Sequence, residues 1–125
     1  MKKLLALASS FLLTTALFAA EPVDIGVTMA AKMVQEKKVT VIDVRTPDEF
    51  KDGHIEGAQN ISVAAEDFAT KLAALDKNQP ILVHCQAGGR SKRSLETFKQ
   101  LGFSNIYHLK DGFSGWEEAG QPVKK

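Results

Sequence analysis

The chain has 125 residues, of which 44% are hydrophobic, and it carries 16 Lys and Arg residues against 15 Asp and Glu residues. This length fits one ordinary domain, and the composition is that of a globular protein rather than a disordered chain or a multi-pass membrane protein. The formal net charge of +1 argues against nucleic acid as the main partner, because phosphate binding needs a basic surface. The single cysteine, Cys85, excludes an intrachain disulfide and a metal centre built from several cysteines.

The first twenty residues differ in character from the rest of the chain. Two lysines precede an uncharged stretch rich in Leu, Ala and Phe, which ends in the small residues Ala19 and Ala20. This pattern predicts a signal peptide over residues 1–20 that is cleaved after Ala20, with a retained membrane anchor as the alternative. We therefore expect a periplasmic or otherwise exported domain over residues 21–125, free of the membrane after cleavage. A lone thiol in such a compartment points to a reactive cysteine or an intermolecular bond, with an inert buried cysteine as the alternative.

Helical and strand patterns alternate along the remaining chain. Apolar spacing and turn signals predict, in chain order, a helix at 28–37, a strand at 39–44, a short helix from Thr46 that ends at Gly53, a strand at 60–63, a helix at 66–75, a strand at 81–84, a helix at 91–101, a strand at 106–109 and a helical turn at 112–118. On the first helix, Met29 and Met33 are expected on the apolar face, with Ala30 and Val34 as further candidates for the same face. This alternation predicts an α/β fold whose central parallel sheet is flanked by helices on both faces.

The segment from Cys85 to Ser91 joins a buried strand to a helix. In open α/β sheets ligands bind at the carboxyl ends of strands, so Cys85 stands where this architecture places chemistry. Gly88 and Gly89 allow the loop to turn its backbone N–H groups toward one centre, and the following helix adds its positive N-terminus. These features favour a nucleophilic thiolate. The alternative is a glycine-rich turn around a buried, inert cysteine.

Three blocks of the sequence resemble the rhodanese family of sulfurtransferases. They are Asp43-Val-Arg45 with the later run from Gly53 to Ile61, the loop from Cys85 to Arg90, and the run from Ile106 to Phe113 followed by Trp116. Together they span nearly all of residues 21–125. Asp111 departs from the family pattern, which more often has a second glycine there, and we expect a local variation of the turn.

The resemblance implies transfer of a sulfane sulfur from thiosulfate or a similar donor, through a Cys85 persulfide, to a thiophilic acceptor such as cyanide, a thiol or a protein. It implies no metal and no organic cofactor, because the cysteine carries the transferred atom, and we expect a monomer. Cys85 is then the catalytic residue. The substrate-binding residues are expected to be Gln86, Ala87, Gly88, Gly89, Arg90 and Lys92, and the loop-supporting residues Asp43, Arg45 and Ser91.

Individual roles follow from the same resemblance and from local geometry. Arg90 is the expected contact for the sulfonate group, whereas Lys92 is equally well explained as a solvated helix residue. We expect Arg45 to pair with Glu49. His84 adjoins Cys85 on an extended strand, where successive side chains point to opposite faces, so it is expected in the core or on the other sheet face.

The length of the loop separates related activities. Rhodaneses that handle sulfane sulfur have a Cys-x4-Arg loop, which the loop here resembles. The related phosphatases and arsenate reductases have a Cys-x5-Arg loop. The spacing here is Cys-x4-Arg, from Cys85 to Arg90. A phosphatase or arsenate reductase is therefore disfavoured. A persulfide-carrying or partner-docking module with little turnover on small donors stays open as the alternative to the enzyme.

Overall fold

The computed structural model describes residues 20–125, so the expected signal peptide, apart from Ala20, lies outside the described residues. The described elements are, in chain order, β1 (Val23–Ile25), α1 (Val27–Gln35), β2 (Thr40–Asp43), α2 (Pro47–Asp52), β3 (Gln59–Asn60), α3 (Phe68–Ala73), β4 (Ile81–His84), α4 (Gly89–Gln100), β5 (Ile106–Leu109) and α5 (Gly112–Glu118). All five strands are parallel and form one sheet in the order β1-β5-β4-β2-β3. The predicted α/β architecture is confirmed. No helix in this part of the chain is long and apolar enough to cross a membrane.

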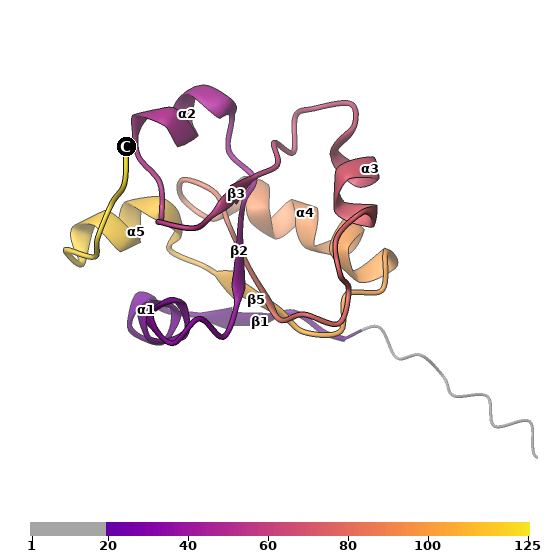
Figure 1. Ribbon diagram of the computed structural model, residues 1–125, viewed down its shortest axis with the longest axis horizontal. Helices are drawn as coiled ribbons and strands as arrows, with labels where there is room; N and C mark the ends of the chain where they lie inside the picture. The colour runs from indigo at the N-terminus through magenta and orange to yellow at the C-terminus, as the bar shows by residue number, and fades with distance from the viewer. Residues whose placement is uncertain (1–19) are drawn as a thin grey trace, which may run out of the picture.

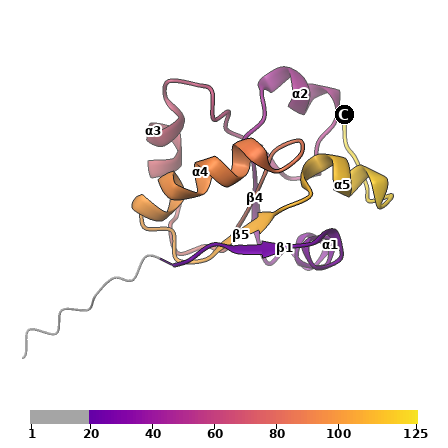
Figure 2. The same ribbon diagram turned by 180° about the vertical axis from the view of Figure 1, so that it is seen from behind.

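Helices cover both faces of the sheet, as Figures 1 and 2 show: α3 and α4 lie on one side, and α1 and α5 on the other. Successive strand residues alternate between the two layers, as expected for a sheet buried on both faces. The layer under α3 and α4 includes Ile42, Val83, Leu95 and Phe98, and the layer under α1 and α5 includes Val41, Leu82, Phe113 and Trp116. The central strand β4 is buried along its whole length, so its carboxyl end is held rigidly by both layers.

Several element boundaries differ from the predicted ones. Strand β1 was not predicted, because three residues are too short a run to give a periodic signal; it forms by pairing with β5, with Val23 opposite Tyr107. The strand predicted at 60–63 is regular only over Gln59–Asn60. The chain nevertheless continues along β2, because the amides of Ile61 and Val63 donate to the carbonyls of Asp43 and Val44 at 3.0 and 3.1 Å.

The predicted inner face of the first helix is wrong for Met29. Helix α1 begins at Val27, one residue before the predicted start, and Ala30 is the residue that is fully buried. Val27 and Val34 lie three and four residues from Ala30 and pack on the same side. Met29 is one residue, or about 100°, away from Ala30 around the helix, and it is 53% exposed.

Candidate active site

Cys85 follows β4 directly and lies on the α4 side of the sheet. Its side chain packs in the same layer as Val83, and the residue is 1% exposed. His84 points to the other face, where its ring stacks near that of Phe113 with centroids 6.2 Å apart. This confirms the predicted core position of His84. Burial disfavours the charged imidazole and lowers the pKa of His84, so this ring is neutral in the core.

The Cys85 sulfur receives hydrogen bonds from the loop and from the first turn of α4. The Gly88 amide donates to Sγ at 3.1 Å, and the Ser91 hydroxyl donates at 3.3 Å. Burial opposes ionisation of the thiol, but the Ser91 hydroxyl and the amides of Ser91, Gly88 and Ala87 outweigh it, so the pKa of Cys85 lies below its ordinary value. The twelve-residue helix α4 begins at Gly89, two residues before the predicted start, and directs its positive end at the same sulfur.

Two glycines allow the loop to sit tightly against the chain that follows β5. Gly88 has φ +101°, and a Cβ there would strike the backbone carbonyl of Lys110. Gly112 has φ +65°, and a Cβ there would lie 2.5 Å from the Gln86 carbonyl oxygen. Only glycine combines this left-handed backbone with so close an approach. The start of α5 then holds the loop, because the Phe113 amide donates to the Cys85 carbonyl at 2.8 Å.

Arg45 braces the loop from the end of β2. Its guanidinium is 2% exposed, and it bonds the Asp43 carboxylate at 2.7 Å, the Gly53 carbonyl at 2.7 Å and the Gln86 side chain at 3.0 Å. The pairing predicted between Arg45 and Glu49 is wrong. Asp43 is closer in the chain and buried with Arg45, and a buried guanidinium needs a buried counter-charge to offset its lost hydration.

Glu49 pairs instead with Arg90. The two guanidinium nitrogens of Arg90 contact the two carboxylate oxygens at 2.7 and 2.9 Å, a bidentate arrangement that stabilises both charges. Arg90 is the main cause that lowers the pKa of Glu49 to about 2, and the Thr46 hydroxyl and amide of the α2 capping box add to it. Arg90 is thus held at the end of the Cys85 loop, bridging it to α2.

The remaining predicted substrate-binding residues take different places. Ala87 and Gly89 lie in the loop and at the start of α4, and the Gln86 side chain is held between Arg45 and the Ser114 hydroxyl, the latter at 2.8 Å. Lys92 lies on the outer side of α4, 71% exposed, with its ammonium 4.0 Å from Asp24. This position favours the solvated surface role for Lys92.

Sequence reasoning missed two residues that connect to the sulfur. His108 on β5 is 1% exposed, and its Nε2 lies 2.7 Å from the Ser91 hydroxyl. Its Nδ1 lies 2.9 Å from the carboxylate of Asp24 on β1. The signal for this group was weak, because β1 was not predicted and these residues stand far apart in the chain.

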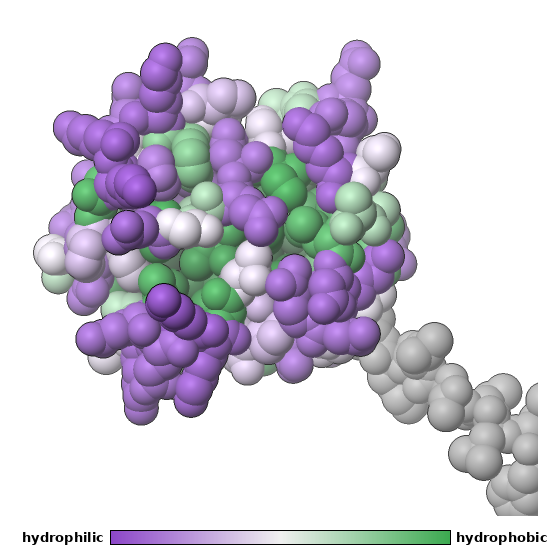
Figure 3. Space-filling view, viewed as in Figure 1, coloured by the Kyte–Doolittle hydropathy of each residue, from purple (hydrophilic) through white to green (hydrophobic). Residues whose placement is uncertain are grey.

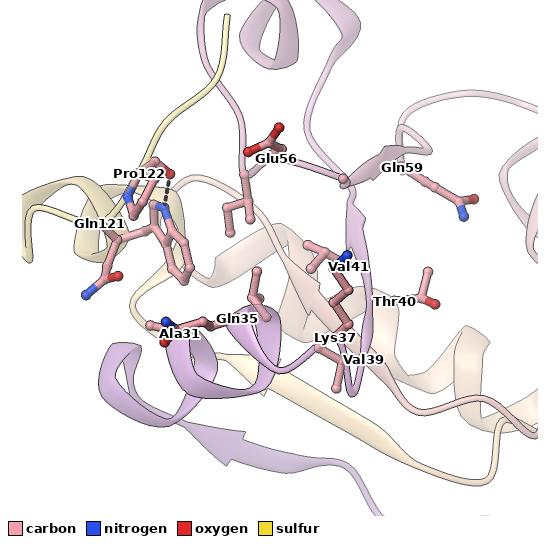
Figure 4. Close-up of a pocket in the computed structure, with 14 residues that line it drawn as sticks. Ala31, Gln35, Lys37, Val39, Thr40, Val41, Glu56, Gln59, Gln121 and Pro122 are labelled. Atoms are coloured by element: carbon pink, nitrogen blue, oxygen red, sulfur yellow. Dashed lines mark hydrogen bonds between the residues drawn. The ribbon is translucent and has the colours of Figure 1, made fainter.

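The surface has one hollow beside the Cys85 loop and a larger one on the opposite face of the sheet. A hollow of about 290 Å³ beside the loop is lined by Arg45, Glu49, Gln86 and Glu117, among others. A larger one of about 840 Å³ lies between α1, β2 and the C-terminal segment, on the sheet face opposite Cys85, with Trp116 in its wall (Figure 4). Figure 3 shows apolar atoms in the hollowed surface between α1 and α2, with hydrophilic side chains around it. Among residues 20–125, no three His, Cys, Asp or Glu side chains are grouped to hold a metal ion.

The chain resembles known proteins over most of its length. Residues 27–119 match the sequence profile described as the rhodanese-like domain. The chain is 33% identical over 95 residues to thiosulfate sulfurtransferase GlpE of Shewanella oneidensis, covering 76% of this chain and 92% of that protein. It is 37% identical over 87 residues to GlpE of Pseudomonas aeruginosa, covering 69% and 76% of the two chains. A rhodanese-related protein from Thermoplasma volcanium has a similar structure, with a TM-score of 0.73, 29% identity and coverage of 82% and 97%.

The close approach at Gly112 predicts a specific cost for a side chain there. Gly112→Ala should destabilise the protein by about 1–3 kcal/mol more than Gly120→Ala, because a Cβ at position 112 meets the Gln86 backbone. Gly120 is the matched control, since it has a similar φ of +72° but nothing within 4 Å of the added atom. Urea unfolding of both variants measures the difference. Equal destabilisation would show that the cost is backbone strain alone.

The ion pair between Glu49 and Arg90 predicts a defined dependence of stability on pH. Glu49 has a folded-state pKa of about 2 against an ordinary value of 4.5, so its stabilising contribution is present above pH 4.5 and is lost as the pH falls toward 2. The wild-type protein should exceed Glu49→Gln in unfolding free energy at neutral pH, and the gap should narrow on acidification. Urea unfolding from about pH 7 to about pH 3 measures it. A gap that stays constant with pH would contradict the assignment.

Proposed function

The chain belongs to the rhodanese-like domain family, and on that premise we propose that it is a sulfurtransferase that moves the outer sulfur of thiosulfate through Cys85 to a thiophilic acceptor. One observation carries the proposal. The only cysteine of the chain is buried at the end of the central strand, and its sulfur accepts hydrogen bonds from the Gly88 amide and the Ser91 hydroxyl. This is the environment that a sulfur nucleophile and an anionic persulfide both require.

In the first half-reaction the Cys85 thiolate attacks the outer sulfur of thiosulfate. A new S–S bond forms, the S–S bond of thiosulfate breaks, and sulfite leaves with the bonding electron pair. Cys85 then carries a persulfide anion, which sits beside the amides and the helix N-terminus that stabilised the thiolate.

In the second half-reaction an acceptor removes the outer sulfur. The acceptor, a thiol or cyanide, attacks that sulfur, and the bond to the Cys85 sulfur breaks with its electron pair returning to Cys85. The Gly88 amide and the Ser91 hydroxyl then stabilise the departing thiolate. The enzyme is thereby restored without any further redox step.

Arg90 is suited to contact the sulfonate end of the donor even though Glu49 holds it. A guanidinium has five N–H donors, and the Glu49 carboxylate takes two of them, leaving three. The Arg90 side chain is 33% exposed, at the end of the loop that begins with Cys85. The pair with Glu49 therefore orients Arg90 rather than consuming it.

Replacement of the nucleophile tests the reaction itself. Cys85→Ser should reduce thiocyanate formation from thiosulfate and cyanide to the level without enzyme, because the serine hydroxyl is a poor nucleophile toward sulfur and forms no persulfide. The circular dichroism and unfolding transition should stay close to those of the wild type, since the side chains are similar in size. Thiocyanate production at the wild-type rate would contradict the mechanism.

Donor preference tests the role of Arg90. Arg90→Ala should raise KM for thiosulfate by about tenfold or more, the loss expected of a charge-assisted hydrogen bond, and affect an organic persulfide donor without a sulfonate group much less. Arg93→Ala is the control, because it removes the same charge one turn further along α4. An equal loss with both donors would assign Arg90 a role in loop structure only.

A further inference from the structure

A continuous hydrogen-bonded chain runs from the reactive sulfur through the interior to the surface. Ser91 Oγ lies 3.3 Å from Cys85 Sγ and 2.7 Å from His108 Nε2, and His108 Nδ1 lies 2.9 Å from Asp24 Oδ1. The first three residues are at most 1% exposed, whereas the Asp24 side chain is 47% exposed. Three separate elements, α4, β5 and β1, supply the links.

We propose that His108 is a positioning residue that holds the proton of Cys85, exchanged through the Ser91 hydroxyl, while Asp24 fixes the ring and stabilises its charged form. This proposal rests on the proposed sulfurtransferase function. Ser91 touches the reacting sulfur, and His108 acts only through Ser91.

The proton positions in the two states follow from the contacts. With Cys85 as a thiol, its S–H donates to Ser91 Oγ, the Ser91 hydroxyl donates to Nε2, and Nδ1–H donates to Asp24. With Cys85 as a thiolate, each shared proton has moved one step, so that the imidazolium Nε2–H donates to Ser91 and the Ser91 hydroxyl donates to Sγ. Every link stays satisfied in both states, and only the protons move.

The proton balance of the reaction closes with this exchange. In the first half-reaction the thiol, neutral His108 and thiosulfate become the Cys85 persulfide anion, imidazolium and sulfite. In the second, the persulfide anion, imidazolium and an acceptor thiol become the Cys85 thiol, neutral His108 and the acceptor's protonated persulfide. His108 thus keeps inside the protein the proton that the first step releases and the second step uses.

The charged groups near His108 are compatible with a ring that gains a proton when Cys85 loses one. Asp24 on β1 faces it directly, and the hydrogen bond from His108 is the main cause that lowers the pKa of this carboxyl. The positive charges of Lys92 on α4 and Lys110 after β5 also lower the pKa of Asp24, and they repel a positive charge on the nearby His108 ring. His84 on β4 adds no charge, because burial keeps its ring neutral. The Asp24 carboxylate is therefore the opposite charge in direct contact with the ring.

The pH dependence of thiol reactivity tests the exchange without relying on sulfur transfer. His108→Gln keeps a hydrogen-bonding group of similar size next to Ser91 but cannot take up the proton. Alkylation of Cys85 by iodoacetamide should shift its pH midpoint upward by about one unit in His108→Gln. Loading of sulfur from thiosulfate in a single turnover should slow by about tenfold near neutral pH and recover at high pH, where the thiol ionises unaided.

Three further variants separate the loss of proton exchange from a folding defect. Asp24→Asn, at a half-exposed position, should shift the alkylation midpoint in the same direction even if His108→Gln does not fold. Ser91→Ala should also shift it, whereas Ser94→Ala should not, because Ser94 is buried one turn later on α4 and its hydroxyl donates to the Ser91 carbonyl rather than to the sulfur. If the pH midpoint of Cys85 alkylation in folded His108→Gln or in Asp24→Asn equals that of the wild type, the proposed exchange is wrong, even where sulfur loading is intact. A shifted midpoint without sulfur loading by the wild type would support the exchange and remove the proposed function.

Discussion

The burial of the reactive Cys85 sulfur is the constraint on which the rest of this structure depends. Cys85 is 1% exposed, and a buried thiolate is stable only where hydrogen-bond donors replace the lost water. The Gly88 amide, the Ser91 hydroxyl and the start of α4 supply them. These donors act only at hydrogen-bond distance from the sulfur, so neighbouring elements have to fix the position of the loop.

The groups that hold the loop come from every neighbouring element. Arg45 and its buried partner Asp43 anchor Gln86 from β2, and Glu49 on α2 holds Arg90 at the other end of the loop. On the α5 side, backbone contact closes the loop where Gly112 leaves no room for a side chain. The loop thus surrounds one buried sulfur and is held from several sides. The hydrogen bonds of Ser91 and His108 connect this sulfur to Asp24 at the surface.

The sequence was sufficient to predict the α/β architecture, the place of Cys85 and the opposite orientation of His84, because these follow from local periodicity and from strand geometry. It was insufficient for contacts between distant segments. Glu49 is near Arg45 in the chain and pairs with Arg90, since Asp43 already compensates the buried guanidinium. Asp24 and His108 meet only because a three-residue strand pairs with β5, and such a short strand leaves no periodic pattern.

In the proposed reaction Cys85 carries the transferred sulfur as a persulfide. Intact mass spectrometry of the protein before and after incubation with thiosulfate, beside Cys85→Ser, tests it most directly. We expect a gain of one sulfur atom in the wild type, lost on addition of cyanide and absent from the variant. No gain in a protein whose thiol is reduced and open to alkylation would contradict thiosulfate as the donor, and a module that receives sulfur from a protein partner would then explain the site better.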